Sequence, residues 1–355
     1  MIVSANYHIK VIIIKAQLML GFLFLFSGCT KNRIETTIIG NTMGTTYLVK
    51  LILENDSLDY KNIQQGIDSV LNTVNRHMST WDPKSEISMF NFSNSILPFV
   101  ASESLIDIMR SSLDISKKTD GLFDVTVYEL MRLWGFGPNP KSGIPTMDEV
   151  KSVLQSSGYE NIKIENGTLI KKNKNLKLDL NAIAKGYGVD KVFDYVKKQG
   201  YNDIFIEIGG EVRCSGKNKR NQKWTIGIEN PISKNDIKSN ICGILDLEAG
   251  AVATSGNYRN FTNLAGDIIG HTLNPKTGFP IITDVLSVTV LAKSCMLADS
   301  WATALMVMNF GNGYQYVKNN PEIEAIWLLK EKENQNRYFS LSSNIPIRDT
   351  IYPIR

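Results

Sequence analysis

The chain of 355 residues is poor in cysteine and histidine, the residues that form disulfides in small domains and bind metals. It has four cysteines and three histidines. Cys214, Cys242 and Cys295 stand far from one another and from Cys29, and no C-x-x-C pair occurs. This spacing argues against a zinc site and against a disulfide scaffold. The last three cysteines are therefore predicted to be small, buried, apolar residues.

An excess of charge of one sign is also missing. The formal net charge is +4, from 39 basic and 35 acidic residues, and no basic run has the density of a nucleic-acid footprint. We expect no nucleic-acid partner. An apolar content of 43% and a charged content of 21% are ordinary for a globular protein. No internal repeat or long linker forces a division into two domains.

The first residues differ from the rest of the chain. Residues 11–26 are almost wholly apolar, which is too short for a confident membrane span but fits the core of a signal peptide. Ser27 and Gly28 stand directly before Cys29, as in lipoprotein signals, where the cysteine is acylated and becomes the new N-terminus. We expect residues 1–28 to be removed and the protein to be lipid-anchored at Cys29, on the extracytoplasmic (periplasmic) side of a bacterial membrane. An ordinary secreted protein and an N-terminal anchor helix remain alternatives.

Residues 29–41 are interpreted as a tether, and residues 42–350 as one domain. Helical spacing of apolar residues, capping residues and terminal glycines predict the helices, and a Thr146-x-x-Glu149 capping box is the sharpest of these signals. The predicted helices cover about 63–77, 105–120 and 147–157, residues 181–199 are predicted to be a loop followed by a helix, and one more helix is predicted around Asp299.

Strand signals lie between these helices. Asn166-Gly167 between two short apolar runs is a strong hairpin signal. Residues 78–91 are expected to be irregular. Hairpins mix with helices without a regular βαβ repeat, which predicts an α+β fold with mixed and antiparallel sheets and packed helices. The predicted strands lie at 45–53, 161–165, 168–172, 177–180, 203–208, 224–228, 242–247, 325–329 and 338–341.

Asp299 and Thr303 form an acid-plus-hydroxyl pair in the sequence L-A-D-S-W-A-T-A-L-M. Their i, i+4 spacing puts both side chains on one face of a helix. The neighbours are mostly apolar, so a carboxylate there is costly unless a positive group meets it. Mg²⁺ or Ca²⁺ suits these oxygens. The alternative is that Asp299 caps the start of the helix.

Four further segments combine glycines with aromatic or acidic residues. Glycines at such junctions let backbone approach a ligand closely, and aromatic residues such as Trp81 offer a face to a flat ring. Taken singly, each segment is explained by turn chemistry and core packing. The segments are N-T-M-G-T-T-Y at 41–47, M-S-T-W-D-P-K-S-E at 78–86, T-D-G-L-F-D-V-T at 119–126 and L-D-L-N-A-I-A-K-G-Y-G-V-D at 178–190, which I-G-G-E at 208–211 follows.

Together and in this order, with H-T-L-N-P-K-T-G at 271–278, these motifs resemble the ApbE family, the FAD:protein FMN transferases. The resemblance covers about residues 42–308. It implies a single α+β catalytic domain that binds FAD and a divalent metal, expected to be Mg²⁺. Such an enzyme moves FMN from FAD to a threonine or serine of a partner protein through a phosphoester bond and releases AMP.

The resemblance also implies site residues. The metal ligands would be the Ala182 carbonyl, Asp299 and Thr303. The residues expected to contact FAD are Met43, Trp81, Leu122, Phe123, Asp124, Lys185 and Leu273, the last through its backbone.

His271 is the expected general base, because a neutral imidazole can take the proton of the incoming hydroxyl. Without residues 1–28 the chain has only His77 and His271. The alternative for His271 is a structural hydrogen bond in its turn. The family usually has Asp where this chain has Asn274, which we interpret as a tolerated turn variant.

Two other functions fit the same motifs. A metal-dependent FAD pyrophosphatase would use water as the acceptor, and a membrane-tethered flavin carrier would need neither the metal nor His271. The family implies acceptor proteins in membrane electron-transport complexes.

Overall fold

The computed structural model describes residues 33–53, 59–231, 241–256, 261–264, 267–330 and 338–342. The predicted signal peptide and Cys29 lie outside the described residues. Within the described ranges, no helix has the length and apolar character needed to cross a membrane.

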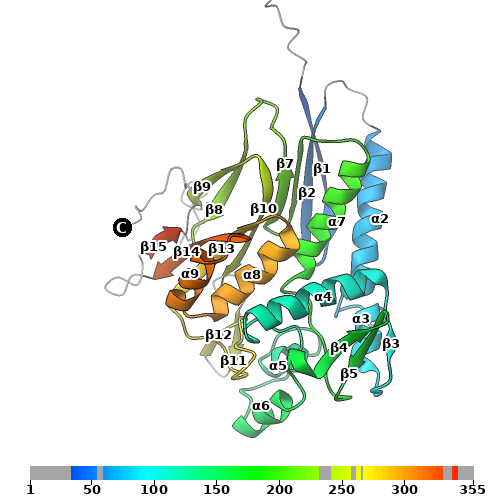
Figure 1. Ribbon diagram of the computed structural model, residues 1–355, viewed down its shortest axis with the longest axis vertical. Coiled ribbons are helices and arrows are strands. Elements are labelled where there is room, and N and C mark those ends of the chain that lie inside the picture. Colours follow the sequence, from blue (N-terminus) through cyan, green and yellow to red (C-terminus); the bar gives the residue numbers. More distant parts are fainter. Residues whose placement is uncertain are drawn as a thin grey trace, which may run out of the picture.

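An eight-stranded sheet forms the centre of the molecule (Figure 1). Every neighbouring pair in it is antiparallel, and its order is β1-β2-β6-β7-β10-β13-β14-β15. The strands are β1 (Ile34–Thr42), β2 (Thr45–Leu53), β6 (Ile204–Ile208), β7 (Glu211–Ser215), β10 (Ala249–Gly256), β13 (Val285–Ala292), β14 (Ile323–Lys330) and β15 (Tyr338–Ser342). The hairpin β11 (Phe261–Leu264) and β12 (Asp267–Gly270) stands apart from this sheet.

The two faces of this sheet are buried against different partners. Ile204, Ile206 and Ile208 of β6 share an apolar cluster with α2 (Tyr60–Met78) and α7 (Ala184–Lys198). Phe205, on the opposite face, packs on Trp224 with 5.4 Å between ring centroids. This alternation is the period of two expected of a strand. The helix α8 (Cys295–Val307) packs on the helical face against β10 and β13, and the hairpin β8 (Trp224–Glu229) and β9 (Ile241–Leu247) covers part of the other face.

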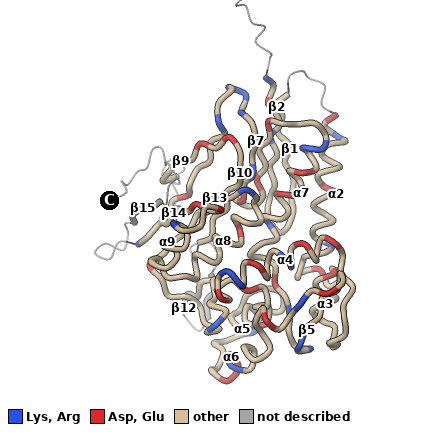
Figure 2. Tube along the Cα trace, viewed as in Figure 1, with Lys and Arg blue, Asp and Glu red and all other residues tan. Residues whose placement is uncertain are grey.

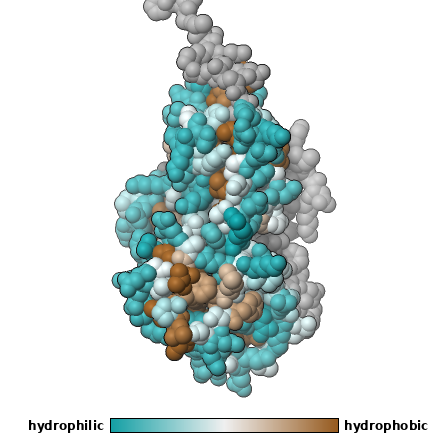
Figure 3. Space-filling model, turned by 90° about the vertical axis from the view of Figure 1, so that its right-hand side faces the viewer, coloured by the Kyte–Doolittle hydropathy of each residue, from teal (hydrophilic) through white to brown (hydrophobic). Residues whose placement is uncertain are grey.

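A second, three-stranded sheet lies beside α4 at the lower end of Figure 1. Its order is β3-β5-β4. Asn166 and Gly167 have φ of 48° and 72° in the turn between β4 and β5, which confirms the predicted hairpin. Apolar residues gather on the outer surface of this end (Figure 3), whereas acidic and basic residues are interspersed along the described chain (Figure 2). The elements are α3 (Glu86–Phe92), β3 (Phe99–Val100), α4 (Glu103–Lys118), α5 (Tyr128–Leu133), α6 (Met147–Leu154), a 3₁₀ turn (Tyr159–Asn161), β4 (Ile162–Glu165) and β5 (Thr168–Lys171), and α9 (Phe310–Lys318) lies beside α8.

The predicted tether over 29–41 is wrong from Ile34 onward, because these residues form β1. Ile38 of this strand is fully buried, and β1 pairs with β2 along its whole length. Met43 and Gly44 have φ of 48° and 71° and connect Thr42 to Thr45 in a two-residue hairpin turn. A methionine in the left-handed region is uncommon, so T-M-G-T does not match the usual pattern of a two-residue hairpin turn.

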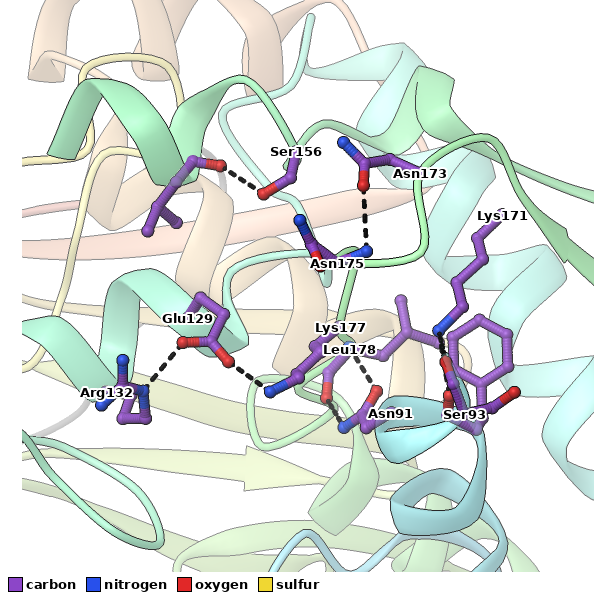
Figure 4. A network of polar contacts seen from close by, with 12 residues as sticks. Asn91, Ser93, Glu129, Arg132, Ser156, Lys171, Asn173, Asn175, Lys177 and Leu178 are labelled. Atoms are coloured by element: carbon purple, nitrogen blue, oxygen red, sulfur yellow. Dashed lines mark hydrogen bonds and ion pairs between the residues drawn. The ribbon is translucent and has the colours of Figure 1, made fainter. Parts of the chain in front are cut away.

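Two other local predictions are wrong. Residues 78–91 are not irregular throughout, because Ser85 caps α3 by accepting from the Ser88 N–H at 3.1 Å. Residues 177–180 do not form a strand. The Leu178 backbone bonds instead to the Asn91 amide, which donates at 2.8 Å and accepts at 2.7 Å (Figure 4). The Asn91 side chain thus satisfies the backbone groups that a neighbouring strand would otherwise pair with.

The remaining predicted helices and strands are confirmed within a few residues. Thr146 and Glu149 form the expected capping box at the start of α6. Cys214, Cys242 and Cys295 are buried, as predicted. The fold is α+β with antiparallel sheets, as expected.

Candidate active site

The start of α8 is fixed by a residue of α7. Ser294 is the N-cap, and the carboxylate of Asp190 accepts from the backbone N–H groups of Cys295 and Met296 at 2.9 Å each. Arg213 of β7 pairs with Asp190 at 2.8 Å. Asp299 therefore lies inside the helix, and the alternative that it caps the helix start is wrong.

Asp299 is 4% exposed and lies where α7 and α8 approach each other closely. Its Oδ2 accepts from the Gly186 N–H at 3.0 Å. A Cβ atom on Gly186 would lie 2.4 Å from the Cys295 carbonyl oxygen, so only glycine permits this approach. Burial raises the pKa of the Asp299 carboxyl, against the opposing charge of Lys185.

Lys185 in the first turn of α7 forms an ion pair with Glu211 at the start of β7. Burial acts to lower the pKa of Lys185, but the charges of Asp299 and Glu211 outweigh it and raise the pKa. Burial is the main cause that raises the pKa of Glu211 to about 7. The positive charge of Lys185 opposes this shift, and the negative charge of Asp299 adds to it. Lys185, whose side chain is one-third exposed, thus lies beside two buried carboxylates in one charge cluster.

Glu211 was missed as a site residue. It is 2% exposed, and its Oε2 has no hydrogen-bond partner among the described residues. The I-G-G-E motif was the signal, because Gly209 and Gly210 adopt φ of 60° and 105° in the turn that leads Glu211 into the cluster.

Thr303 lies one turn after Asp299 on α8, as the spacing predicts. Its hydroxyl lies 3.1 Å from that of Ser255 in β10. Ala182 is partly buried two residues before α7 begins. No group of three His, Cys, Asp or Glu side chains that could hold a metal occurs in the described ranges. The donors near Asp299 are mixed hard oxygens, including the Oε2 of Glu211, and their chemistry fits Mg²⁺.

Met43 lies next to α7. A Cβ atom on Gly188 would be 2.8 Å from the Met43 Cε. Met43, Leu122 and Ala182 all pack against the same apolar cluster, which also contains Phe123 and Trp301. Parts of three motifs that lie far apart in the sequence thus border one apolar core.

His271 lies in a second group, in the loop after β12. Its ring is 6.4 Å from that of Phe136, at 70°. Leu273 is 6% exposed and pairs with Pro280 across the loop. Trp134 donates from Nε1 to the Gly278 carbonyl at 2.7 Å, which fastens the loop to the end of α5.

Asn274 shapes the turn of this loop. Its side-chain oxygen accepts from the N–H groups of Lys276 at 2.9 Å and Thr277 at 3.3 Å. Its backbone N–H donates to Phe279, and its carbonyl accepts from Gly278, at 2.8 Å each. The amide makes the hydrogen bonds of a turn residue, in agreement with the interpretation of Asn274 as a turn variant.

The segment 119–126 borders the same loop, since Lys276 pairs with Asp120 at 2.6 Å. Phe123 is 1% exposed. The Asp124 carboxylate accepts from Thr126 and from the Tyr159 N–H, with three bonds of 2.7 Å. Phe123 and Asp124 thus hold the segment in place, whereas Leu122 is only partly buried. Trp81 is 66% exposed and lies in the turn before α3.

Comparisons with known proteins agree with this arrangement. The model of the ApbE family matches residues 43–327. The FAD:protein FMN transferase of Vibrio cholerae is 39% identical over 325 residues, which cover 91% of this chain and 96% of that protein. The enzyme of the same name from Salmonella typhimurium is 30% identical over 332 residues, covering 89% and 93%.

Solved structures give the same result. Flavin transferase ApbE from Vibrio cholerae superimposes with a TM-score of 0.79 and 37% identity, covering 88% of this chain and 98% of that one. The apo form of Pseudomonas stutzeri flavinyl transferase ApbE has a TM-score of 0.78 and 30% identity, covering 87% and 95%. With the motifs, the buried charge cluster and the fold all in agreement, this chain is a member of the ApbE family.

Proposed function

We infer that this chain is an FAD:protein FMN transferase, which moves FMN from FAD to a threonine or serine hydroxyl of an acceptor protein. The similarity to enzymes of this name over about nine-tenths of the chain carries the inference. The cluster of Lys185 with the buried Glu211 and Asp299 supports it, since carboxylates this costly to bury are expected where a charged substrate or ion is bound.

The metal is part of the proposal. Asp299, Thr303 and the Ala182 carbonyl would hold Mg²⁺. Because Oδ2 of Asp299 accepts from Gly186, Oδ1 would be the oxygen that binds the metal. When bound, Mg²⁺ would neutralise charge on the FAD pyrophosphate. Lys185 would supply a second positive charge there once the pyrophosphate competes with Glu211 for it.

His271 would act on the acceptor hydroxyl. The hydroxyl oxygen attacks the phosphorus of the FMN half, a new P–O bond forms, and the bond between that phosphorus and the AMP oxygen breaks. The hydroxyl proton passes to His271, and AMP leaves with the electron pair of the broken bond. The products are the FMN phosphoester of the acceptor and AMP.

Location and acceptor complete the proposal. The S-G-C sequence supports lipidation at Cys29 and anchoring on the extracytoplasmic side of a membrane, where subunits of electron-transport complexes would be the acceptors. Cys29→Ala should leave the chain unlipidated. Intact-mass analysis that finds residues 1–28 retained in the wild type would contradict the anchor.

One experiment separates transfer from hydrolysis. The chain is incubated with FAD and Mg²⁺, with and without membranes from source cells that lack its gene. Transfer predicts a membrane protein whose mass increases by that of FMN less water, on threonine or serine. Rapid conversion of FAD to FMN and AMP without any labelled protein would instead identify a pyrophosphatase, and FAD binding without turnover would identify a carrier.

A further inference from the structure

Large exposed apolar side chains are concentrated in one short part of the chain. Of the twelve found among the described residues, six lie within residues 81–100. Figure 3 shows apolar residues gathered at this end of the molecule. Such a concentration marks an interaction site more often than chance exposure. The six, which we name the α3–β3 apolar surface, are Trp81, Met89, Phe92, Ile96, Leu97 and Val100.

The frame beneath this surface is rigidly held. The buried Lys171 donates to the carbonyls of Phe90 and Ser93 at 3.2 and 2.8 Å, at the C-terminal end of α3 (Figure 4). At the other end of α3, Glu86 accepts from the Ser102 hydroxyl at 2.6 Å. A surface whose helix is fastened at both ends is pre-organised, and binding to it costs little ordering entropy.

The surface includes an open strand edge. Among the described residues, β3 pairs with β5 and has no second neighbour in its sheet. Val100 of β3 is 81% exposed, and Leu97 just before it is 74% exposed. An unpaired edge with apolar side chains beside it is a template for an extended segment of another protein.

The surface is linked to the segment that leads to Ala182. Asn91 of α3 bonds to both backbone groups of Leu178. Leu178 precedes Ala182 by four residues, a stretch that spans at most about 14 Å. The turn that carries Trp81 is tied to α3 as well, because the Ser85 hydroxyl donates to the Ser79 carbonyl at 2.6 Å. Trp81 is the member of this surface that the family resemblance assigns to the flavin.

We propose that the α3–β3 apolar surface is the docking site of the acceptor protein, which adds an extended apolar segment to the edge of β3. The proposal rests on the transferase function, because an enzyme that modifies a protein has to hold that protein beside its site. A membrane is the poorer occupant. If Cys29 carries lipid, the four residues from there to Arg33 reach at most about 14 Å, so the lipid holds the end where β1 begins. That end lies opposite the α3–β3 end in Figure 1.

The test uses the full-length chain with Leu97→Asp and Val100→Asp combined, both at exposed positions where substitution spares the fold. Ile39→Asp is the matched control, since Ile39 is an exposed apolar residue on another edge strand, β1. Two rates are measured: FMN transfer to membranes from cells that lack the gene, at several membrane concentrations, and FAD conversion to FMN and AMP without membranes. We expect the FMN transfer rate of the double variant to be at least tenfold below wild type at limiting membrane concentration, while its rate of FAD conversion stays within twofold of wild type. The control should change neither rate.

Wild-type transfer by the double variant would overturn the docking site, and so would an equal loss of both rates, which would place these residues in the FAD site or the fold. If the wild type converts FAD but labels no protein, the transferase function itself fails and the docking site with it. A photo-cross-linking residue at Val100 gives a second reading. Adducts with the flavin-labelled protein support the proposal, whereas adducts with lipid alone overturn it.

Discussion

The backbone N–H of Gly186 donates to Oδ2 of Asp299 at 3.0 Å, so the first turn of α7 meets the second turn of α8 at a buried carboxylate. One carboxylate oxygen is held by backbone, so the other would be the one that binds a ligand. This contact orients the acid that we assign to the metal without using a second side chain.

Gly186→Ala should damage this contact. The new Cβ would lie 2.4 Å from the Cys295 carbonyl oxygen, and backbone has to move to admit it. We expect the free energy of unfolding to fall by about 1–3 kcal/mol, with FAD turnover falling further because Asp299 shifts. Chemical denaturation and turnover assays measure the two. Gly311→Ala in α9 is the control, since its nearest neighbour would be 3.6 Å away. Equal changes in the free energy of unfolding and in turnover for the two variants would contradict this prediction.

Asp299→Asn keeps the shape of the side chain but removes its charge. We expect Mg²⁺-dependent turnover to fall more than about 100-fold. This loss is larger than the one expected when a residue that only hydrogen-bonds to a metal ligand is removed. Thr303→Val should behave similarly, whereas Thr303→Ser keeps the hydroxyl and should retain most activity. Mn²⁺ binding to each variant, measured by electron paramagnetic resonance, reports on the site independently of turnover. Unchanged Mn²⁺ affinity in Asp299→Asn would rule out the assigned ligand.

His271→Ala should slow transfer by about 10²–10⁴-fold with little change in FAD affinity, because a general base acts in the transition state. Stopped-flow transfer rates and FAD titration separate the two quantities. The control is Phe136→Leu, which removes the ring beside His271 and should have a much smaller effect on the rate. A His271→Ala variant that transfers FMN at the wild-type rate would leave only the structural role for this residue.

Glu211→Gln should change how stability depends on pH in the metal-free protein. Its pKa is about 7 in the fold against an ordinary 4.5, so between these values the folded state keeps a proton that the unfolded state has lost. The free energy of unfolding therefore falls as pH rises from about 4.5 to about 7, and this contribution is absent in the variant. Relative to wild type, the free energy of unfolding of the variant should rise by on the order of 1–3 kcal/mol as pH increases across that window. Urea denaturation in EDTA at pH 5, 6, 7 and 8 measures it, and a constant difference across the series would refute the shifted pKa.

Local chemistry in the sequence determined much of this protein. The capping box at Thr146, the Asn166-Gly167 turn and the i, i+4 spacing of Asp299 and Thr303 each depend on residues within one turn, so sequence alone predicted them. The order of the motifs indicated the family, and with it the reaction.

Tertiary structure decided what depends on distant residues. Glu211 meets Lys185 across 26 positions, and Asp190 caps α8 across 105. The Asn91 amide, 87 positions away, replaces the strand neighbour that residues 177–180 were expected to have. None of these partners leaves a periodic trace in the sequence, because the packing of helices on the sheet brings them together. The sequence thus indicated the family and the reaction that it implies, and the packing decided which charges are buried together.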